Sequence, residues 1–289
     1  MTHDTLTTGR VRMAVSRAIT VAVHSNVLIA VAAASVAVTA SLLCDYPIAP
    51  LPVGIVFAAT LFVYGCNRLT DLAEDERNLP GRAAFTRRYG RPLAAVGTVL
   101  YLGTVGLAFA RDLPGASFLW LPAAVAGLYS LGRLKRIFLV KNLLVGVSWG
   151  IVPLGVGVYF GTIRPPLVAF AGYVAVMLTT AAVVFDVKDV AGDRREGIRT
   201  VPVLFGPATT RRVAQLTNLG AAGAVVALVW SGLLPARFLV LLAFNAYVGC
   251  YVPLATPDRG PLFYGFVIDG EHVFLAALVV VLDAVGWLG

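Results

Sequence analysis

Two sets of acidic residues lie where long hydrophobic segments of the chain meet loops rich in arginine and lysine. The first set comprises Asp71 and Asp75 together with the amide of Asn67, and the second comprises Asp186, Asp189 and Asp193. Because a carboxylate near lipid is costly unless opposite charge compensates it, ionisable groups at such positions indicate function. On a helix, the i, i+4, i+8 and i, i+3, i+7 spacings place each set along one face. The spacings predict two rows of carboxylates that face one cavity.

Two facing rows of carboxylates beside many basic residues are suited to a magnesium diphosphate complex. Mg²⁺ prefers oxygen ligands and is usually held by one or two carboxylates together with substrate phosphates and water. Arginine and lysine then contact the remaining phosphate oxygens. We expect on the order of two or three Mg²⁺ ions, whose charge offsets both the carboxylates and a diphosphate. A polyisoprenyl diphosphate suits such a site, because its tail can lie among helices or in lipid while its diphosphate stays beside the charged residues.

The composition indicates what kind of protein positions these residues. The 289-residue chain is 58% hydrophobic and only 13% charged, and its mean hydropathy is +0.84. These values exclude an ordinary soluble domain and predict an all-α, polytopic membrane protein. Segments close to the roughly 20 residues that cross a bilayer run over 19–43, 51–70, 92–110, 115–132, 142–161, 166–185, 213–233, 238–256 and 263–287. We therefore expect a single domain over 1–289, with nine transmembrane helices and an N-terminal tail at 1–18.

The last of these segments carries polar residues whose place the sequence does not decide. Asp269, Glu271 and His272 interrupt its beginning. They form either a polar end of the last span or part of the wall of the cavity.

The distribution of basic residues predicts the orientation in the membrane. Of the 23 lysines and arginines, Arg111, Arg164 and Arg237 fall on one side of the predicted spans, and the remaining 20 fall on the other. Since basic residues concentrate on the cytoplasmic side, we expect the N-terminus and both acidic sets to be cytoplasmic. An odd number of spans then places the C-terminus outside. The predicted location is the plasma membrane, or the inner membrane of a cell with two.

Other binding functions are not supported by the sequence. The net charge of +8 arises from loops that flank apolar spans, where basic residues serve as topology signals and headgroup anchors. We therefore expect no nucleic acid partner, and no obligate protein partner is evident. The three cysteines, Cys44, Cys66 and Cys250, are too dispersed for a disulfide framework or a metal site. Glycines of the fifth span, Gly146, Gly150, Gly155 and Gly157, predict close helix packing.

The two acidic motifs resemble those of the UbiA superfamily of intramembrane prenyltransferases. Residues 67–75, NRLTDLAED, match the family pattern NxxxDxxxD, and Asn78, Pro80 and Arg82 resemble its N-x-P-x-R continuation. The family's second pattern, DxxDxxxDxxxGxxTxxVxxG, is similar to the stretch that contains Asp186, Asp189, Asp193, Gly197, Thr200, Val203 and Gly206. Tyr129-Ser130, Lys135-Arg136 and Asn142 are similar to the family's YSxxKR loop. The resemblance extends over nearly the whole chain and implies a helical bundle.

The resemblance also implies a role for each matched residue. Its metal ligands for Mg²⁺ are Asn67, Asp71, Asp75, Asp189 and Asp193, with Asp186 supporting or ligating. The candidate diphosphate contacts that the resemblance implies are Arg82, Lys135, Arg136, Arg194 and Arg199. Arg68 occupies a position where many family members have aspartate, and it adds a further candidate phosphate contact. The implied reaction is ionisation of the isoprenyl diphosphate, in which departing pyrophosphate leaves an allylic cation for an acceptor to attack. The ring of Tyr129 either stabilises that cation or is a structural aromatic at the membrane interface.

The acceptor and the reaction class stay open at the level of the sequence. Many quinone-pathway members carry an arginine and a Lys-Pro pair in the first span, whereas this chain has His24-Ser25-Asn26 and no proline before Pro47. The acceptor is an aromatic quinone precursor or another lipophilic small molecule. One alternative is a terpene cyclase of the same superfamily, which uses no acceptor. A second is a transporter, although transporters place binding groups near the midplane of the bilayer, and these acids lie at the ends of spans.

Overall fold

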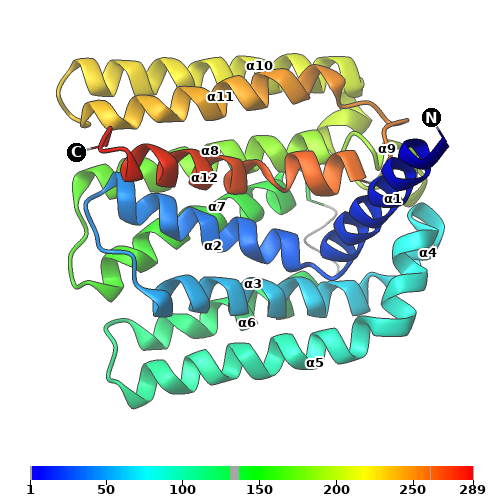
Figure 1. The fold of residues 1–289 in the computed structure, drawn as a ribbon, viewed down its shortest axis with the longest axis horizontal. Coiled ribbons are helices and arrows are strands. Elements are labelled where there is room, and N and C mark those ends of the chain that lie inside the picture. Colours follow the sequence, from blue (N-terminus) through cyan, green and yellow to red (C-terminus); the bar gives the residue numbers. More distant parts are fainter. Residues whose placement is uncertain (1, 131–136, 261, 289) are drawn as a thin grey trace.

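Long helices lie side by side and place their connections at two opposite ends of the molecule (Figure 1). The structure, a computed structural model, describes residues 2–130, 137–260 and 262–288, and these residues contain no strand. The helices are α1 (Thr2–His24), α2 (Val27–Leu43), α3 (Pro50–Thr70), α4 (Leu72–Asn78), α5 (Pro80–Ala110), η1 (Ala116–Trp120), α6 (Leu121–Ser130), α7 (Val140–Tyr159), α8 (Pro165–Phe185), α9 (Val190–Glu196), α10 (Val201–Trp230), η3 (Ala236–Val240), α11 (Leu241–Tyr251), η4 (Val252–Leu254), η5 (Phe263–Ile268) and α12 (Glu271–Ala284). The predicted all-α class is confirmed.

Most of the predicted spans are helices that can cross a membrane. In the described part of the chain, seven helical segments are long and apolar enough, and the bent pair α1 and α2 makes an eighth when counted as one span. The predicted span at 115–132 corresponds to η1 and α6, whose apolar stretch Ala116–Gly127 is shorter. Residues 131 and 132 lie outside the described residues. The ninth span therefore stays a prediction.

The first predicted span is wrong as a continuous helix. The chain bends by 73° between Met13–His24 and Val27–Leu43. At the bend Asn26 has a φ of 63°, a left-handed conformation that asparagine tolerates better than most residues. The Asn26 side-chain oxygen also accepts a hydrogen bond from Arg68 Nε at 3.2 Å. A contact between distant segments thus helps to hold a break that the apolar pattern does not reveal.

The interior of the bundle is built on α2 and on the pair α7 and α8. Alanines along α2, among them Ala32, Ala37 and Ala40, are fully buried. Small side chains at these positions let the neighbouring helices α3, α7 and α12, all of which pack on α2, approach closely. The acidic motifs follow directly on α3 and α8, so this packing determines where both motifs lie.

The predicted close packing of the fifth span is confirmed at three of its four glycines. A Cβ added to Gly146 would lie 2.0 Å from Thr179 Oγ1, and one added to Gly150 would lie 2.8 Å from Ala175 Cβ. A Cβ on Gly157 would be 2.6 Å from Leu167 Cδ2, whereas one on Gly155 would meet no atom within 4 Å. These contacts hold α7 against α8 in a single register.

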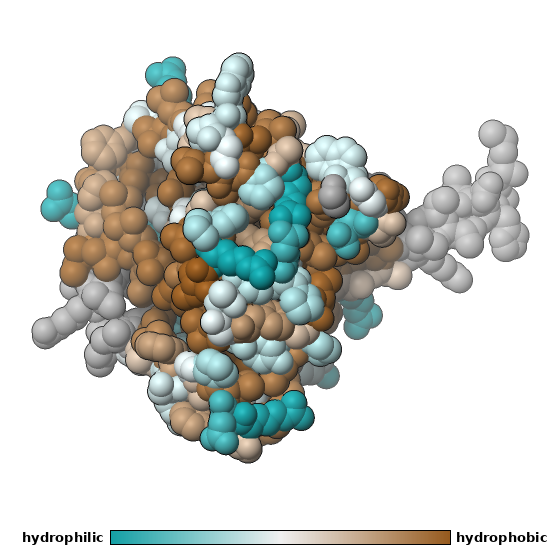
Figure 2. Space-filling view, turned by 90° about the vertical axis from the view of Figure 1, so that its left-hand side faces the viewer, coloured by the Kyte–Doolittle hydropathy of each residue, from teal (hydrophilic) through white to brown (hydrophobic). Residues whose placement is uncertain are grey.

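The end of the molecule opposite to the acidic motifs has a polar cluster of its own. Arg237 pairs with Asp45, and Arg164 donates to the Asp45 carbonyl oxygen at 3.0 Å and lies over the Tyr46 ring at 4.8 Å. Figure 2 shows this end, where hydrophilic groups are surrounded by hydrophobic side chains. The arrangement fits a multi-pass membrane protein whose loops are tied together at the interface.

Candidate active site

The first acidic motif spans the junction of α3 and α4. Helix α3 ends at Thr70, Asp71 lies between the two helices, and Asp75 lies on α4. The Asp71 N–H donates to the Asn67 carbonyl and the Asp75 N–H to the Asp71 carbonyl, each at 2.9 Å. These i to i+4 bonds carry the helical hydrogen-bond pattern across the junction, although the three residues are divided between α3 and α4.

The second acidic motif, like the first, does not lie on a single helix, so that expectation is wrong for both. Helix α8 ends at Phe185 and α9 begins at Val190. Between them the Asp189 N–H donates to the Asp186 carbonyl at 3.1 Å, an i to i+3 bond typical of a tight turn. The helical pattern resumes afterwards, because the Asp193 N–H donates to the Asp189 carbonyl at 2.9 Å. The motif therefore turns at the helix end before it reaches Asp193.

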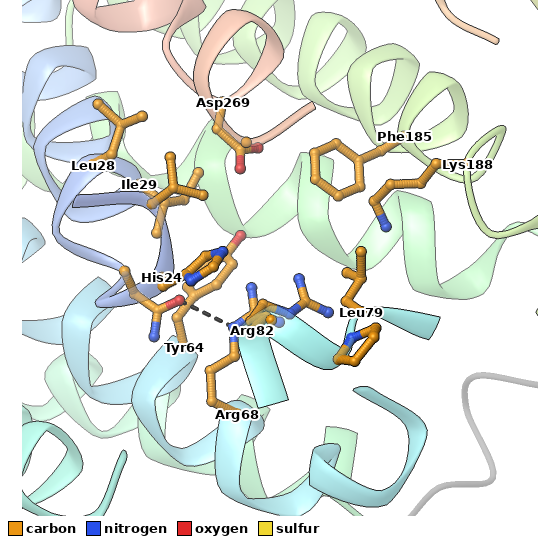
Figure 3. Close-up of a pocket in the computed structure, with 15 residues that line it drawn as sticks. His24, Leu28, Ile29, Tyr64, Arg68, Leu79, Arg82, Phe185, Lys188 and Asp269 are labelled. Atoms are coloured by element: carbon orange, nitrogen blue, oxygen red, sulfur yellow. Dashed lines mark hydrogen bonds between the residues drawn. The ribbon is translucent and has the colours of Figure 1, made fainter. Parts of the chain in front are cut away.

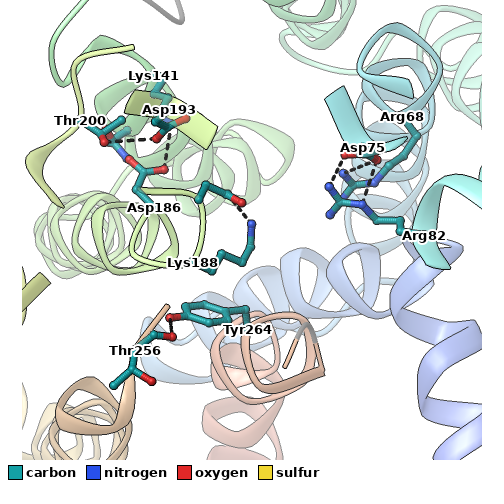
Figure 4. Close-up of polar contacts among 12 residues, drawn as sticks. Arg68, Asp75, Arg82, Lys141, Asp186, Lys188, Asp193, Thr200, Thr256 and Tyr264 are labelled. Carbon is teal, nitrogen blue, oxygen red and sulfur yellow. Dashed lines mark hydrogen bonds and ion pairs between the residues drawn. The ribbon is translucent and has the colours of Figure 1, made fainter. Parts of the chain in front are cut away.

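Arginine side chains compensate the first motif. Asp75 is buried and forms a bidentate pair with Arg82, whose Nε lies 2.9 Å from Asp75 Oδ2. A second guanidinium, that of Arg68, lies 3.9 Å from the same oxygen (Figure 4). Bidentate pairs of this kind are stronger than single hydrogen bonds between neutral groups. The counterions that the sequence requires are thus in place.

Lysine side chains compensate the second motif. Lys141 Nζ lies 2.9 Å from Asp186 Oδ1 and 3.8 Å from Asp193 Oδ2. Asn142 Nδ2 donates to Asp186 Oδ2 at 3.0 Å, and Thr200 Oγ1 donates to Asp193 Oδ2 at 3.2 Å. In addition, Lys188 pairs with Asp189. In the sequence Lys141 is one of the 20 basic residues on the predicted cytoplasmic side. Its place inside the motif is a finding of the structure.

Burial changes the acidity of the second motif. It raises the pKa of Asp193 to about 6, although the nearby charge of Lys141 acts in the opposite direction. The pKa of Asp186 is also raised by burial, and Lys141 and Asn142 oppose that change. Because a buried carboxylate favours its neutral form unless a cation is near, these two aspartates depend on a bound positive charge.

A cavity of about 280 Å³ lies between the two motifs (Figure 3). Its lining includes three cationic side chains, Arg68, Arg82 and Lys188, and one acid, Asp269. Apolar side chains complete the wall, among them Leu28, Ile29 and Phe185. The cavity thus offers positive charge beside an apolar surface, which is the combination that a lipid diphosphate requires.

Basic partners of the motif acids, and not the acids themselves, belong to the described lining of this cavity. In Figure 4 the Asp75 group lies on one side and the Asp186 and Asp193 group on the other, with Lys188 between them. The predicted metal ligands are not among the described residues that line the cavity, but the cations paired with Asp75 and Asp189 are. That the two rows of carboxylates face one cavity therefore stays a prediction, because basic side chains and not these acids form the described wall of the cavity.

The first motif fits a magnesium ion. Asn67 Oδ1 is buried and has no hydrogen-bond partner among the described residues, and an amide oxygen is an acceptable ligand for a hard cation. Nowhere in the described residues do three histidine, cysteine, aspartate or glutamate residues form a group that could hold a metal. A magnesium site at the first motif therefore stays a proposal, which the unpartnered Asn67 Oδ1 supports.

The remaining predicted residues lie elsewhere. Arg194 and Arg199 are exposed, and neither belongs to the described lining of the cavity. Lys135 and Arg136 lie outside the described residues, and so does the side chain of Tyr129, whose backbone belongs to α6. Their predicted roles stay predictions.

Several cavity residues were not predicted from the sequence. His24 and Asn26 line the cavity because the first span breaks beside them, and Tyr64 lies one turn before Asn67 on α3. The polar run His24-Ser25-Asn26 inside an apolar segment was the available signal. Asp269 lines the cavity, which decides between the two alternatives for this residue, whereas Glu271 and His272 are buried.

Comparison with known proteins agrees with this geometry. The model of the UbiA prenyltransferase family matches residues 26–259. The chain belongs to this family. A digeranylgeranylglyceryl phosphate synthase from Thermococcus gammatolerans is 33% identical over 223 residues, which cover 72% of this chain and 74% of that protein. A 4-hydroxybenzoate solanesyltransferase from Synechocystis is 26% identical over 83% of this chain and 84% of that protein.

The family resemblance seen in the motifs is thereby confirmed, although not every relative aligns along its whole length. The chain spans about half the length, 54%, of the digeranylgeranylglyceryl phosphate synthase from Methanothermobacter thermautotrophicus, at 29% identity. Among solved structures, a UbiA homologue from Archaeoglobus fulgidus bound to GPP and Mg²⁺ has a TM-score of 0.64 and 12% identity, covering 89% of this chain and 96% of that one. This likeness confirms the UbiA-like fold.

Proposed function

We propose that this UbiA family member transfers a prenyl group from an isoprenyl diphosphate to a lipophilic acceptor, in a reaction that depends on Mg²⁺. The observation that carries the proposal is the cavity between the two acidic motifs, lined by Arg68, Arg82 and Lys188 beside apolar side chains. Cations at this place bind a diphosphate, and the apolar wall accepts the first part of an isoprenyl chain. The solved relative that is bound to GPP and Mg²⁺ supports the same substrate class.

Each motif contributes its oxygen ligands to this site. Asn67, Asp71 and Asp75 would hold Mg²⁺ on one side, and Asp189 would contribute from the other. Asp186 and Asp193, the other two predicted ligands, are paired with Lys141 in the structure. When bound, the metal neutralises negative charge on the departing pyrophosphate. The unpartnered Asn67 Oδ1 supports the first of these assignments.

The basic side chains of the cavity bind the diphosphate and stabilise the charge that develops on it. In the structure, Arg82 is paired with Asp75 and Lys188 with Asp189. A bound diphosphate offers them phosphate oxygens, and the guanidinium of Arg82 can contact two of these at once. The charges are preorganised where negative charge develops as the carbon–oxygen bond breaks. The apolar wall limits the access of water to the allylic cation.

Transfer to an acceptor is favoured over the alternatives. The Synechocystis relative is named for transfer to 4-hydroxybenzoate, which supports an acceptor reaction rather than cyclisation. The acids lie at helix ends beside basic residues, which argues against transport through the midplane. His24, Asn26 and Asp269 offer polar contacts in the same cavity, so we infer that the acceptor has a polar head group as well as an apolar body.

Removing one predicted metal ligand tests the proposal. Purified protein is incubated with geranyl, farnesyl or geranylgeranyl diphosphate and Mg²⁺, with and without candidate acceptors, and lipid extracts are analysed by mass spectrometry. We expect an adduct only when an acceptor is present, and we expect Asp71→Ala to lower pyrophosphate release at least about 10²-fold. Asp283→Ala, a change at the exposed far end of α12, is the matched control. Full activity of Asp71→Ala would contradict the proposal, and a hydrocarbon or terpene alcohol formed without acceptor would show a cyclase instead.

A further inference from the structure

The ammonium group of Lys141 is held between two aspartates of the second motif. Its Nζ lies 2.9 Å from Asp186 Oδ1 and 3.8 Å from Asp193 Oδ2. The side chains of these two aspartates are 8% and 6% exposed, and that of Lys141 is 18% exposed. In such surroundings the electrostatic interaction of the three groups is weakly screened. The lysine therefore supplies positive charge where the motif carries two buried acids.

Helix packing fixes the position from which Lys141 reaches these acids. Lys141 lies in the first turn of α7, next to Asn142, which donates to Asp186 Oδ2 at 3.0 Å. One turn later Gly146 is packed so closely on α8 that an added Cβ would lie 2.4 Å from the Ala175 carbonyl oxygen. The start of α7 therefore cannot slide along α8, and the end of the lysine side chain stays at the aspartates.

A divalent ion that bridges Asp186 and Asp193 would need the same space. Mg²⁺ binds carboxylate oxygens at about 2.0–2.1 Å, and an ammonium group already lies between these two carboxylates. The other oxygen of Asp186 is occupied by Asn142, and Thr200 donates to the Asp193 oxygen that faces Lys141. Two cations at this place would repel each other, so lysine and metal exclude one another.

The first motif differs from the second in this respect. Its counterions, Arg68 and Arg82, line the cavity and can turn to a substrate, and Asn67 Oδ1 is buried without a hydrogen-bond partner in the described part of the chain. In the second motif, among the residues that the structure describes, only Asp189 is paired with a lysine that lines the cavity, Lys188. The geometry thus leaves room for metal at the first motif and at Asp189, and little between Asp186 and Asp193.

We propose that Lys141 is a built-in cation that takes the place of one divalent ion in the second motif. The protein then binds fewer Mg²⁺ ions than its six predicted ligand residues suggest, and Asp186 and Asp193 act as positioning residues for Lys141. The inference rests on the proposed function for its meaning, because it concerns the metal requirement of the same site. It can nevertheless be tested by metal binding alone.

The test counts the Mn²⁺ ions bound per chain. Mn²⁺ prefers the same oxygen ligands as Mg²⁺, and its free concentration is measured by electron paramagnetic resonance. The variants are Lys141→Met, which keeps the length of the side chain and removes its charge, and Lys141→Gln, which keeps a polar end. Lys141→Arg retains a cation, and Arg91→Met removes an exposed positive charge from α5.

We expect Lys141→Met and Lys141→Gln to bind about one more Mn²⁺ ion per chain than the wild type, because the freed carboxylates become metal ligands. Lys141→Arg and Arg91→Met should keep the wild-type number. Equal numbers in all five proteins, with unchanged affinity, would overturn the inference. Thermal unfolding in detergent identifies a variant that has lost its fold. If Lys141→Met or Lys141→Gln does not fold, the number of Mn²⁺ ions bound by the other one tests the inference.

Pyrophosphate release with geranylgeranyl diphosphate separates this inference from the proposed function. If the wild type releases no pyrophosphate with any donor while Lys141→Met gains an ion, the proposed function fails and the built-in cation stands. If the wild type is active and Lys141→Met gains no ion, the built-in cation fails and the proposed function stands.

Discussion

At the scale of single residues, the buried acids Asp75, Asp186 and Asp193 each lie close to a basic side chain on another helix. Asp75 is paired with Arg82, and Asp186 with Lys141, which lies 45 positions earlier in the sequence. Moving such charges away from water is costly, and only close partners with good geometry offset that cost. The pairs therefore stabilise the site and also store positive charge beside the cavity.

Arg82 is the residue where stability and substrate binding are most closely connected. The change Arg82→Ala leaves the buried Asp75 without its bidentate partner, and breaking a buried pair costs about 3–5 kcal/mol. The same change removes a cation from the cavity, so we expect a higher KM for the isoprenyl diphosphate as well as a lower melting temperature. Both are measured on purified protein in detergent.

Arg87→Ala is the matched control for this prediction. Arg87 pairs with Glu76, but their side chains are 65% and 38% exposed, and exposed pairs contribute about 0–1 kcal/mol. We expect little change in either quantity. If the two variants behaved alike, the pairing of Arg82 with Asp75 would have no special role.

At the scale of elements, the sequence predicts the spans well and their interruptions poorly. The i+4 spacing at Asn67, Asp71 and Asp75 is matched by i to i+4 hydrogen bonds, because these bonds depend on neighbouring residues only. The bend at Asn26 was not predictable from hydropathy, since it involves a hydrogen bond to Arg68, 42 residues away. The third span is predicted to begin at residue 92, because charged residues precede it. In the structure α5 begins at Pro80, and proline is favoured in the first turn of a helix.

Parts of the site depend on contacts that no local pattern contains. The role of Lys141 follows from the register of α7 on α8, and the place of Asp269 follows from the packing of η5 beside α1 and α8. The sequence identifies both residues as charges near a span. Only the assembled bundle shows which charges meet.

The variant Gly146→Ala tests the register of α7 on α8. In Gly146→Ala the new methyl group would lie 2.0 Å from Thr179 Oγ1 and 2.4 Å from the Ala175 carbonyl, so the two helices must separate. Overpacking of this kind costs about 1–3 kcal/mol, and it also moves Lys141 and Asn142 away from Asp186. We expect a lower melting temperature together with reduced pyrophosphate release.

Gly155→Ala provides the comparison within the same helix. A Cβ at Gly155 meets no atom within 4 Å, so stability and activity should stay close to those of the wild type. A loss of equal size in both variants would indicate a general intolerance of α7 to alanine, and the proposed register would lose its support.

At the scale of the whole molecule, charge separates the two ends of the bundle. The N-terminus, α4 and α9 lie at one end, and the C-terminus lies at the other (Figure 1). The second end contains Arg111, Arg164 and Arg237, three of the 23 basic residues, and Arg237 is neutralised by Asp45. This asymmetry is the physical basis for proposing that the acidic motifs face the cytoplasm.

Labelling of single cysteines tests this orientation. In a chain whose native cysteines are replaced by alanine, Arg195→Cys places a thiol on the exposed surface of α9, and Ser231→Cys places one in the exposed turn after α10. Because translocating a strongly basic loop is unfavourable, a membrane-impermeant maleimide should label Ser231→Cys from outside intact spheroplasts. It should reach Arg195→Cys only after the membrane is opened. The reverse pattern would place the site on the outer face, and a diphosphate donor would then have to reach it from outside the cell.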